Sequence, residues 1–172
     1  MTPTPAPVPD TPRLHLREAC DDDAGFIVAL LNEPGFLRYI GDRQVRTPDD
    51  ARGYIARLRA HYREHGFGLY VVALNDGRVP IGICGLLKRD ALDAPDIGFA
   101  FLRAYERRGY AFEAAAAVLA DARARLGIAR VLAITALDNE RSMHLLRKLG
   151  LRRDGEVALP QPGDVSALFV AD

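Results

Sequence analysis

The sequence predicts a mixed α/β domain in which helices flank a central, mostly antiparallel sheet. Short runs that alternate apolar and polar residues, as strands do, lie on both sides of longer segments with the 3.6-residue period of helices. Consecutive strand-like runs in the middle of the chain are typical of an antiparallel meander. The 172 residues suffice for one domain with a substantial core, and no internal repeat or boundary divides them.

Each expected element has a local pattern that predicts it. Strands are expected at residues 13–17, 67–74, 81–87, 96–102 and 131–137, helices at 24–32, 47–66, 111–126 and 139–149, and two strand-like pieces within 151–172. In the first strand, Leu14 and Leu16 alternate with polar residues, so one face is expected to be buried. The second helix has a strong start signal, because Thr47 caps it, Pro48 occupies its first turn and Asp50 follows three residues after the cap.

Turn residues separate these elements. The first helix follows three aspartates and is expected to end at Glu33-Pro34-Gly35, before a short apolar piece at 36–40. Asn75-Asp76-Gly77 lies between two apolar runs, which indicates a hairpin. The run at 131–137 is apolar and has polar flanks, which favours a buried strand. Asn139 is placed to cap the helix that follows.

One stretch, residues 96–126, combines a strand, a basic turn and a long helix. The strand alternates large and small residues, so its large side chains share one face. The other face carries only Gly98, Ala100 and the carboxylate of Asp96. This small face leaves room for a ligand beside the backbone. The helix has an apolar period of 3.6 residues, and Gly127 ends it.

The turn between this strand and this helix is a candidate anion site. Gly109 allows the chain to bend sharply and lets a ligand approach the backbone. The start of a helix offers unpaired N–H groups and the positive end of a dipole, and Arg107 and Arg108 add charge. A phosphate or pyrophosphate suits such a site. On these features alone, an ordinary strand-to-helix turn with a solvated rim is the alternative interpretation.

Composition and charge exclude several classes of protein. Hydrophobic residues make up 49% of the chain and charged residues 27%, and Lys plus Arg equal Asp plus Glu at 23 each. The balanced charge gives no argument for a nucleic-acid or membrane partner, and no apolar run approaches the roughly 20 residues of a membrane span. The N-terminus lacks the basic and apolar regions of a signal peptide.

Two further expectations concern the ends of the chain and its thiols. Cys20 and Cys84 do not make a disulfide framework, so we expect reduced thiols in a cytoplasmic protein. Residues 1–11 are rich in proline and are expected to be extended and flexible, whereas residues 12–172 are expected to form a single domain.

The sequence of the basic turn resembles a motif of a known protein family. RRGYAFEA, with Gly109 and Ala111, resembles the acyl-CoA pyrophosphate loop of the GNAT (Gcn5-related) N-acetyltransferases, most closely that of the ribosomal-protein N-terminal acetyltransferases. Residues 13–17, 81–86 and 139–151 resemble further blocks of the same branch, so the resemblance covers residues 12–172. The first position of the loop is Glu106, where the family pattern has Gln or Arg.

This resemblance implies the GNAT fold and an acetyl-CoA-dependent N-acetyltransferase that needs no metal. Acetyl would pass to a primary amine by direct attack in a ternary complex. In this family the strand before the loop splays from its neighbour, and pantetheine binds its exposed backbone, which corresponds here to Phe99, Ala100, Phe101 and Leu102. The pyrophosphate would meet the N–H groups of Arg107, Arg108, Gly109, Tyr110 and Ala111.

Three polar residues are candidates for the chemistry. Asp96 lies near the place where some relatives have a base, so we expect it to accept the amine proton; a solvated strand-edge carboxylate and a water chain are the alternatives. Asn139 is expected to cap its helix, and the resemblance implies a contact with the pantetheine arm or a bound water. Relatives carry an acidic Tyr where this chain has Leu146. Ser142, expected beside the buried leucines, is the natural replacement for that Tyr and an expected cofactor ligand. The alternative is that the Ser142 hydroxyl only caps the helix.

The acceptor stays open between a peptide N-terminus and a small-molecule amine. By resemblance, residues 36–46 and 158–164 line the acceptor side, and they form no strongly acidic groove, so a polycationic acceptor is not favoured. A non-catalytic acyl-CoA-binding module is the alternative function, and a monomer or a homodimer fits either one. His61 and His65 are four residues apart on a helix but lack a third ligand, so no metal site is expected.

Overall fold

The computed structural model describes residues 7–159 and 165–172. The strands are β1 Leu14–Arg17, β2 Leu69–Leu74, β3 Pro80–Leu87, β4 Asp96–Phe101, β5 Val131–Ala136, β6 Arg152–Ala158 and β7 Val165–Ala171. The helices are α1 Ala24–Leu31, α2 Pro34–Tyr39, α3 Pro48–His65, α4 Tyr110–Ala124 and α5 Glu140–Lys148, with short 3₁₀ helices at Asp21–Asp23 and Arg103–Tyr105. None of the helices in this part of the chain is both long and apolar enough to cross a membrane.

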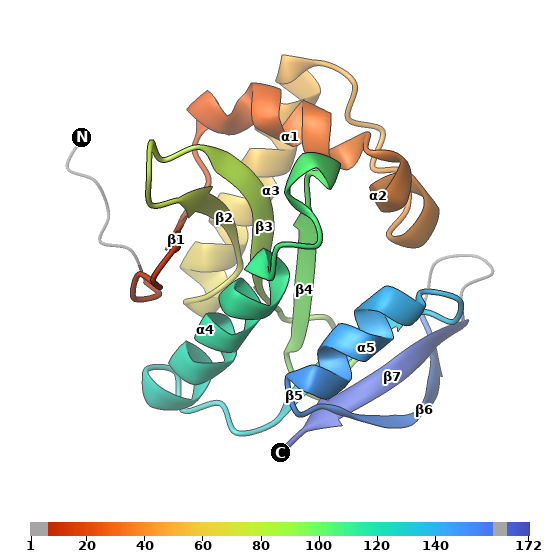
Figure 1. Ribbon diagram of the computed structural model, residues 1–172. Helices are drawn as coiled ribbons and strands as arrows, with labels where there is room; N and C mark the ends of the chain where they lie inside the picture. The colour runs from red at the N-terminus through yellow and green to blue at the C-terminus, as the bar shows by residue number, and fades with distance from the viewer. Residues whose placement is uncertain (1–6, 160–164) are drawn as a thin grey trace.

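The strands form one sheet in the order β1-β2-β3-β4-β5-β7-β6. Every neighbouring pair is antiparallel except β4 and β5, which are parallel. Helices α4 and α5 lie on one face of the sheet, and α3 lies behind it together with α1 (Figure 1). The prediction of a mixed, mostly antiparallel sheet flanked by helices is therefore confirmed.

Most elements begin within two residues of the positions that local sequence signals predict, but the segment after α1 differs. Thr47 Oγ1 accepts a hydrogen bond from the Asp50 N–H at 3.1 Å, so α3 starts with the predicted cap. The segment expected as a short apolar piece is instead the helix α2. Pro34 ends the run of α1 but also begins α2, because proline fits the first helical position, where its missing N–H is not needed.

Strands β4 and β5 are hydrogen-bonded only where they begin. Asp96 pairs with Leu132, and the Leu132 N–H donates to the Pro95 carbonyl at 2.9 Å. Beyond this point β5 pairs with β7 along its other edge, and β4 pairs with β3. Because backbone groups alternate between the two edges of a strand, those of Phe99 and Phe101 face the gap between β4 and β5. The sheet is thus open at its centre.

The residues before β1 pack against the domain. The side chain of Val8 is buried, and the amide of Asn75 donates to the carbonyl of Thr11 at 2.7 Å. These contacts differ from the expectation of a flexible segment as far as residue 11. Residues 1–6 of that segment lie outside the described residues.

Candidate active site

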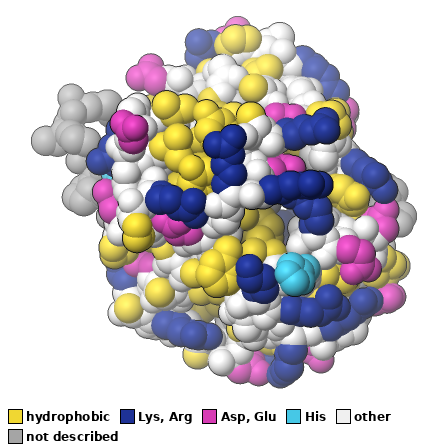
Figure 2. Space-filling model, viewed as in Figure 1, with side chains coloured by type: hydrophobic (Ala, Val, Ile, Leu, Met, Phe, Trp, Pro, Cys, Tyr) yellow, Lys and Arg dark blue, Asp and Glu magenta, His cyan; other side chains and the backbone are white. Residues whose placement is uncertain are grey.

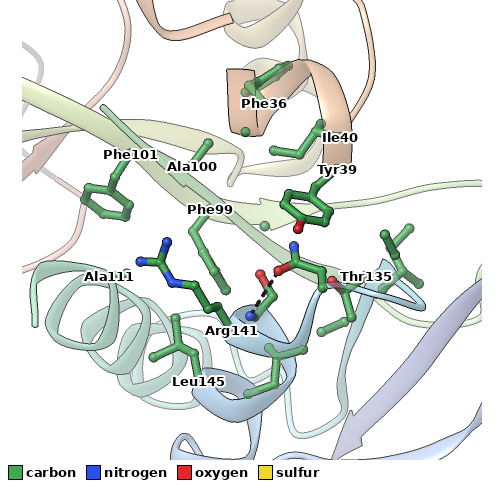
Figure 3. Close-up of a pocket in the computed structure, with 18 of the residues that line it drawn as sticks. Phe36, Tyr39, Ile40, Phe99, Ala100, Phe101, Ala111, Thr135, Arg141 and Leu145 are labelled. Carbon is green, nitrogen blue, oxygen red and sulfur yellow. Dashed lines mark hydrogen bonds between the residues drawn. The ribbon is translucent and has the colours of Figure 1, made fainter. Parts of the chain in front are cut away.

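A cavity of about 1620 Å³ opens at the gap between β4 and β5. In Figure 3, Phe99 of β4 lies near its centre and Phe101 toward the left, with side chains of α2 on one side and those of α5 on the other. The volume exceeds the roughly 300–1,000 Å³ of pockets that hold one drug-sized molecule. It therefore has room for an extended ligand together with a second, smaller one.

The turn from β4 to α4 presents a row of free N–H groups to this cavity. Arg107 and Gly109 have left-handed backbone conformations, with φ of 62° and 81°. The first N–H of this region with an acceptor is that of Glu113, which donates to the Gly109 carbonyl at 3.1 Å. In the described part of the chain, the N–H groups from Arg107 to Ala111 have no protein acceptor. Such a row at the positive end of a helix suits an anion, as expected for the pyrophosphate.

Arg13 holds this turn from the side of β1. Its Nη1 donates to the Arg108 carbonyl at 2.9 Å, and its guanidinium lies 4.4 Å from the centre of the Tyr110 ring. The carboxylate of Glu113, in the first turn of α4, accepts from Arg13 Nε at 2.7 Å and from the Arg13 N–H at 3.0 Å. Thr11 Oγ1 donates to the same carboxylate at 2.7 Å. We call this set, Thr11, Arg13 and Glu113, the turn clamp.

Sequence reasoning missed the turn clamp. No pattern in the sequence indicated a role for Glu113, and Arg13 entered only as part of the strand and family block at 13–17. Burial raises the pKa of Glu113, but hydrogen bonds from Thr11 and Arg13 lower this pKa by a larger amount. The net shift is downward, so the carboxylate stays ionised. Arg13 and Glu113 are a hundred residues apart in the chain, so no local pattern could have joined them.

Two predicted ligands do not face the cavity, although Phe99, Ala100 and Phe101 do. Leu102 donates its N–H to the Ile81 carbonyl and accepts from the Tyr105 N–H, both at 2.9 Å. Both backbone groups of Leu102 are therefore already paired. By the same alternation the backbone of Ala100 faces β3, so Phe99 and Phe101 are better placed to offer backbone groups to a ligand. Arg108 is not among the residues that line the cavity, and its carbonyl accepts from Arg13, so the turn faces the cavity through Arg107, Gly109, Tyr110 and Ala111.

Asp96 is a buried carboxylate at the base of the gap. Its exposed fraction is 1%, and its Oδ1 accepts from Nε of Arg89 at 3.0 Å. Burial raises the pKa of Asp96, although the Arg89 guanidinium opposes this shift. The alternative of a solvated strand-edge carboxylate is wrong, because β4 is an inner strand between β3 and β5. A carboxylate with a raised pKa is better matched to accepting a proton near neutral pH.

Asn139 and Ser142 lie together at the start of α5. Asn139 Oδ1 accepts from the Ser142 N–H at 3.3 Å, so the predicted cap is confirmed. The buried residues of α5 are Met143 and Leu146, and Ser142 lies beside them, half-buried in the cavity wall. The Ser142 hydroxyl makes no hydrogen bond to the described residues.

Basic side chains surround the mouth of the cavity. Figure 2 shows Lys and Arg side chains around an apolar hollow on this face of the molecule. Two ion pairs link the wall formed by β5 and α5 to the opposite wall. Arg38 of α2 lies 3.3 Å from Asp138, and Nη1 of Arg141 lies 3.1 Å from Oε2 of Glu106.

His61 contacts backbone groups through both ring nitrogens. Its Nε2 accepts from the Lys88 N–H at 3.1 Å, and its Nδ1 lies 2.8 Å from the Phe67 carbonyl. The Lys88 contact assigns the ring proton to Nδ1. Residues 7–159 and 165–172 contain no group of three or more side chains placed to hold a metal ion.

Comparison with known proteins agrees with this geometry. The acetyltransferase (GNAT) domain model matches residues 13–152. The uncharacterized N-acetyltransferase YoaA of Bacillus subtilis is 30% identical over 151 residues, which cover 87% of this chain and 85% of that protein. A GNAT-family acetyltransferase structure from Bordetella pertussis has a TM-score of 0.79 at 24% identity, covering 96% of this chain and 99% of that one. A RimL ribosomal L7/L12 α-N-acetyltransferase, solved with coenzyme A, has a TM-score of 0.72 at 15% identity, covering 95% and 96%. The chain belongs to the GNAT family and is an acetyl-CoA-dependent N-acetyltransferase.

Proposed function

We propose that this enzyme transfers acetyl to a primary amine by direct attack, with acetyl-CoA and the amine bound together in the cavity. The observation that carries the proposal is the row of free N–H groups from Arg107 to Ala111, next to the open gap between β4 and β5. The row would hold the pyrophosphate, and the backbone of Phe99 and Phe101 would hold the pantetheine arm. Acetyl-CoA supplies the activated acyl group, and the protein supplies positioning and proton transfer.

The amine would approach from the side of α2. In Figure 3, Phe36 and Tyr39 of α2 and Ile40 just after it lie across β4 from α5. Asp96 lies on the same face of β4 as Gly98 and Ala100, whose small side chains leave a path along the strand. A methyl group added to Gly98 would meet only Leu69, at an ordinary contact distance of 3.7 Å. This path connects the acceptor side of the cavity with the candidate base.

Asp96 would accept the amine proton through a water molecule. Its carboxylate is almost fully buried, and one of its oxygens already binds Arg89, so little of it is open to direct contact. Its raised pKa increases its strength as a base relative to an ordinary carboxylate. Arg89 keeps the buried charge paired.

Ser142 would stabilise the thiolate that leaves when the amine attacks. Leu146, at the position where relatives carry an acidic Tyr, has no proton to donate. The Ser142 hydroxyl lines the cavity without a partner among the described residues, and it lies in the first turn of α5, where the helix dipole favours negative charge. Serine is a weak acid, so we expect a hydrogen bond to sulfur or a relay of a proton from water. Asn139, whose Oδ1 caps α5, would offer its NH₂ group to the pantetheine arm.

The charges on the acceptor side bear on the class of amine. Arg38, Arg43 and Arg89 line this part of the cavity together with the carboxylates Glu33, Asp90 and Asp96, so the described lining carries no acidic excess. A lining without an acidic excess disfavours a polycationic acceptor. We therefore propose a peptide N-terminus or a small amine without further positive charges. Residues 160–164, in the hairpin expected to complete this side, lie outside the described residues.

An acetyl-CoA turnover screen over amines and N-terminal peptides tests this function. We expect free thiol to appear only when a suitable amine is present, with one acetylated amine formed for each thiol released. Initial rates at varied concentrations of both substrates should give intersecting reciprocal plots, as a ternary complex requires. Parallel plots and an acetylated protein would contradict direct attack. CoA binding without turnover on any amine would favour the non-catalytic module instead.

A further inference from the structure

One ion pair crosses the gap on the cofactor side. Glu106, just before the row of free N–H groups, accepts from Nη1 of Arg141 at 3.1 Å. Both side chains line the cavity, but they belong to opposite walls. Glu106 extends from the wall of β4 and the α4 turn, and Arg141 extends from the first turn of α5. The pair therefore spans the groove that the pyrophosphate arm of the cofactor would follow.

We propose that Arg141 is a phosphate ligand that exchanges Glu106 for the pyrophosphate when the cofactor binds. In the free protein, Glu106 forms an ion pair with the Arg141 guanidinium and keeps that group at the mouth of the groove. Figure 3 shows the Arg141 side chain reaching from α5 toward Ala111 at the start of α4. Ala111 belongs to the row of free N–H groups, so the guanidinium is already directed to the place where a pyrophosphate would lie. The inference rests on the proposed function, because it assumes that acetyl-CoA enters this groove.

The exposure of the pair favours this exchange. The side chain of Arg141 is 61% exposed and that of Glu106 is 34% exposed, so solvent screens their attraction and little is lost when it breaks. A pyrophosphate carries more negative charge than a carboxylate and offers oxygens to the two-pronged guanidinium. The pyrophosphate should therefore displace Glu106 from Arg141.

The same geometry explains how a carboxylate is tolerated at the head of an anion-binding turn. Glu106 stands where the family pattern has Gln or Arg, and an isolated carboxylate there would repel the pyrophosphate. Arg141 neutralises Glu106 in the free protein and supplies, from the opposite wall, the cation that position 106 lacks. Glu106 then acts as a competitor of the ligand rather than as a part of its site.

A purely structural ion pair and this exchange predict opposite results for Glu106. If the pair only ties the two walls together, removal of either partner should loosen the groove and weaken cofactor binding, or leave it unchanged. If Glu106 competes with the phosphate, removal of Glu106 should strengthen binding, whereas removal of Arg141 should weaken it. Opposite signs for two partners of one ion pair are therefore the diagnostic result.

Titration calorimetry on the full chain, with CoA, dephospho-CoA and pantetheine as ligands, tests the exchange. We expect the dissociation constant for CoA to rise on the order of tenfold in Arg141→Gln. In Glu106→Gln the same constant should fall about two- to fivefold. Dephospho-CoA should show the same changes, because it keeps the pyrophosphate. Pantetheine, which has no phosphate, should bind the three proteins equally.

Arg152 and Asp172 provide matched controls. They form an exposed ion pair at 2.9 Å, and neither lines the cavity. Arg152→Gln and Asp172→Asn change the net charge by the same amounts as the two test variants, and we expect them to leave CoA affinity unchanged.

Several results would overturn the exchange. One is a Glu106→Gln protein that binds CoA no more tightly than the wild type. Another is an Arg141→Gln loss that is absent with dephospho-CoA, since this would assign Arg141 to the 3′-phosphate. An equal loss with pantetheine would show that Arg141 acts through the shape of the groove. If the wild-type protein bound no CoA at all, the proposed function itself would fail, and the inference with it.

Discussion

Replacing Glu113 with alanine should loosen the pyrophosphate turn, although Glu113 does not line the cavity. The carboxylate is 17% exposed and accepts from Thr11 Oγ1 at 2.7 Å, from the Arg13 N–H at 3.0 Å and from Arg13 Nε at 2.7 Å. The same guanidinium holds the Arg108 carbonyl at 2.9 Å. Loss of Glu113 therefore removes the anchor of the side chain that fixes the turn.

The expected cost follows from these contacts. Each hydrogen bond to a charged group is worth about 1.5–3 kcal/mol. Three are lost, but the side chain of Arg13 is 45% exposed, so water replaces part of what its guanidinium loses. The Thr11 hydroxyl also has the Leu14 carbonyl within 3.4 Å. We therefore expect a loss of about 2 kcal/mol in the free energy of unfolding, which lowers Tm by roughly 4–8 °C for a chain of this size.

Thermal unfolding and CoA titration on one preparation test this prediction. We expect the dissociation constant for CoA to rise roughly three- to tenfold in Glu113→Ala. Asp121→Ala is the matched control, because Asp121 lies near the other end of α4, is 6% exposed and binds Arg125 at 2.7 Å. It should lower Tm by a similar amount and leave CoA affinity unchanged. A Glu113→Ala protein with a lower Tm but wild-type CoA affinity would refute a role of the turn clamp in the site.

The turn clamp also has a predicted pH dependence. The net pKa shift of Glu113 is downward in the folded protein, so its ionised carboxylate stabilises the fold above the ordinary carboxyl pKa. This stabilisation is lost as the pH falls through the lowered pKa. The difference in Tm between the wild type and Glu113→Ala should therefore shrink in acid, and a constant difference would contradict the ion pair as its source.

Three substitutions test the remaining site residues. Gly109→Val should raise the CoA dissociation constant at least tenfold, about 1.4 kcal/mol. The φ of 81° at this position strains a β-branched residue, and the added Cβ would lie 3.3 Å from Arg13. Unchanged affinity by calorimetry would contradict the turn assignment. Asp96→Asn should lower turnover by roughly 10²–10⁴ with CoA affinity nearly intact. It should also remove an acidic limb that the raised pKa places above the ordinary carboxyl range, and a wild-type rate–pH profile would leave Asp96 a structural role. Ser142→Ala should reduce the single-turnover rate far more than acetyl-CoA affinity, and a lower Tm with a normal rate would end the thiolate hypothesis.

Local signals were sufficient for most of the fold. The cap of α3 at Thr47 and the hairpin turn after β2 depend on residues within a few positions of one another, and both lie where the sequence places them. Pro34 misled the prediction because proline can follow one helix and begin the next, and only the path of the chain decides between these roles. The gap between β4 and β5 was expected from the family resemblance rather than from any pattern within the strands.

Long-range contacts of the site could not be predicted. Glu113 with Arg13, Asp96 with Arg89, and Glu106 with Arg141 each join different elements. The sequence offers 23 basic residues as partners for each carboxylate, and spacing does not choose among them.

The pairing of the Leu102 backbone could not be predicted for a related reason. The direction of its N–H depends on strand parity, which the register with β3 sets. The sequence identified the correct strand but not the edge that each backbone group faces.

A structure of the protein with CoA bound would show whether the turn and the gap hold the cofactor. We expect a pyrophosphate within hydrogen-bonding distance of the N–H groups of Arg107, Gly109, Tyr110 and Ala111, with the pantetheine arm between β4 and β5. The sulfur should lie beside Ser142 and Asn139. Phosphates on another surface, or a sulfur outside the gap, would show that this cavity is not the acetyl-CoA site.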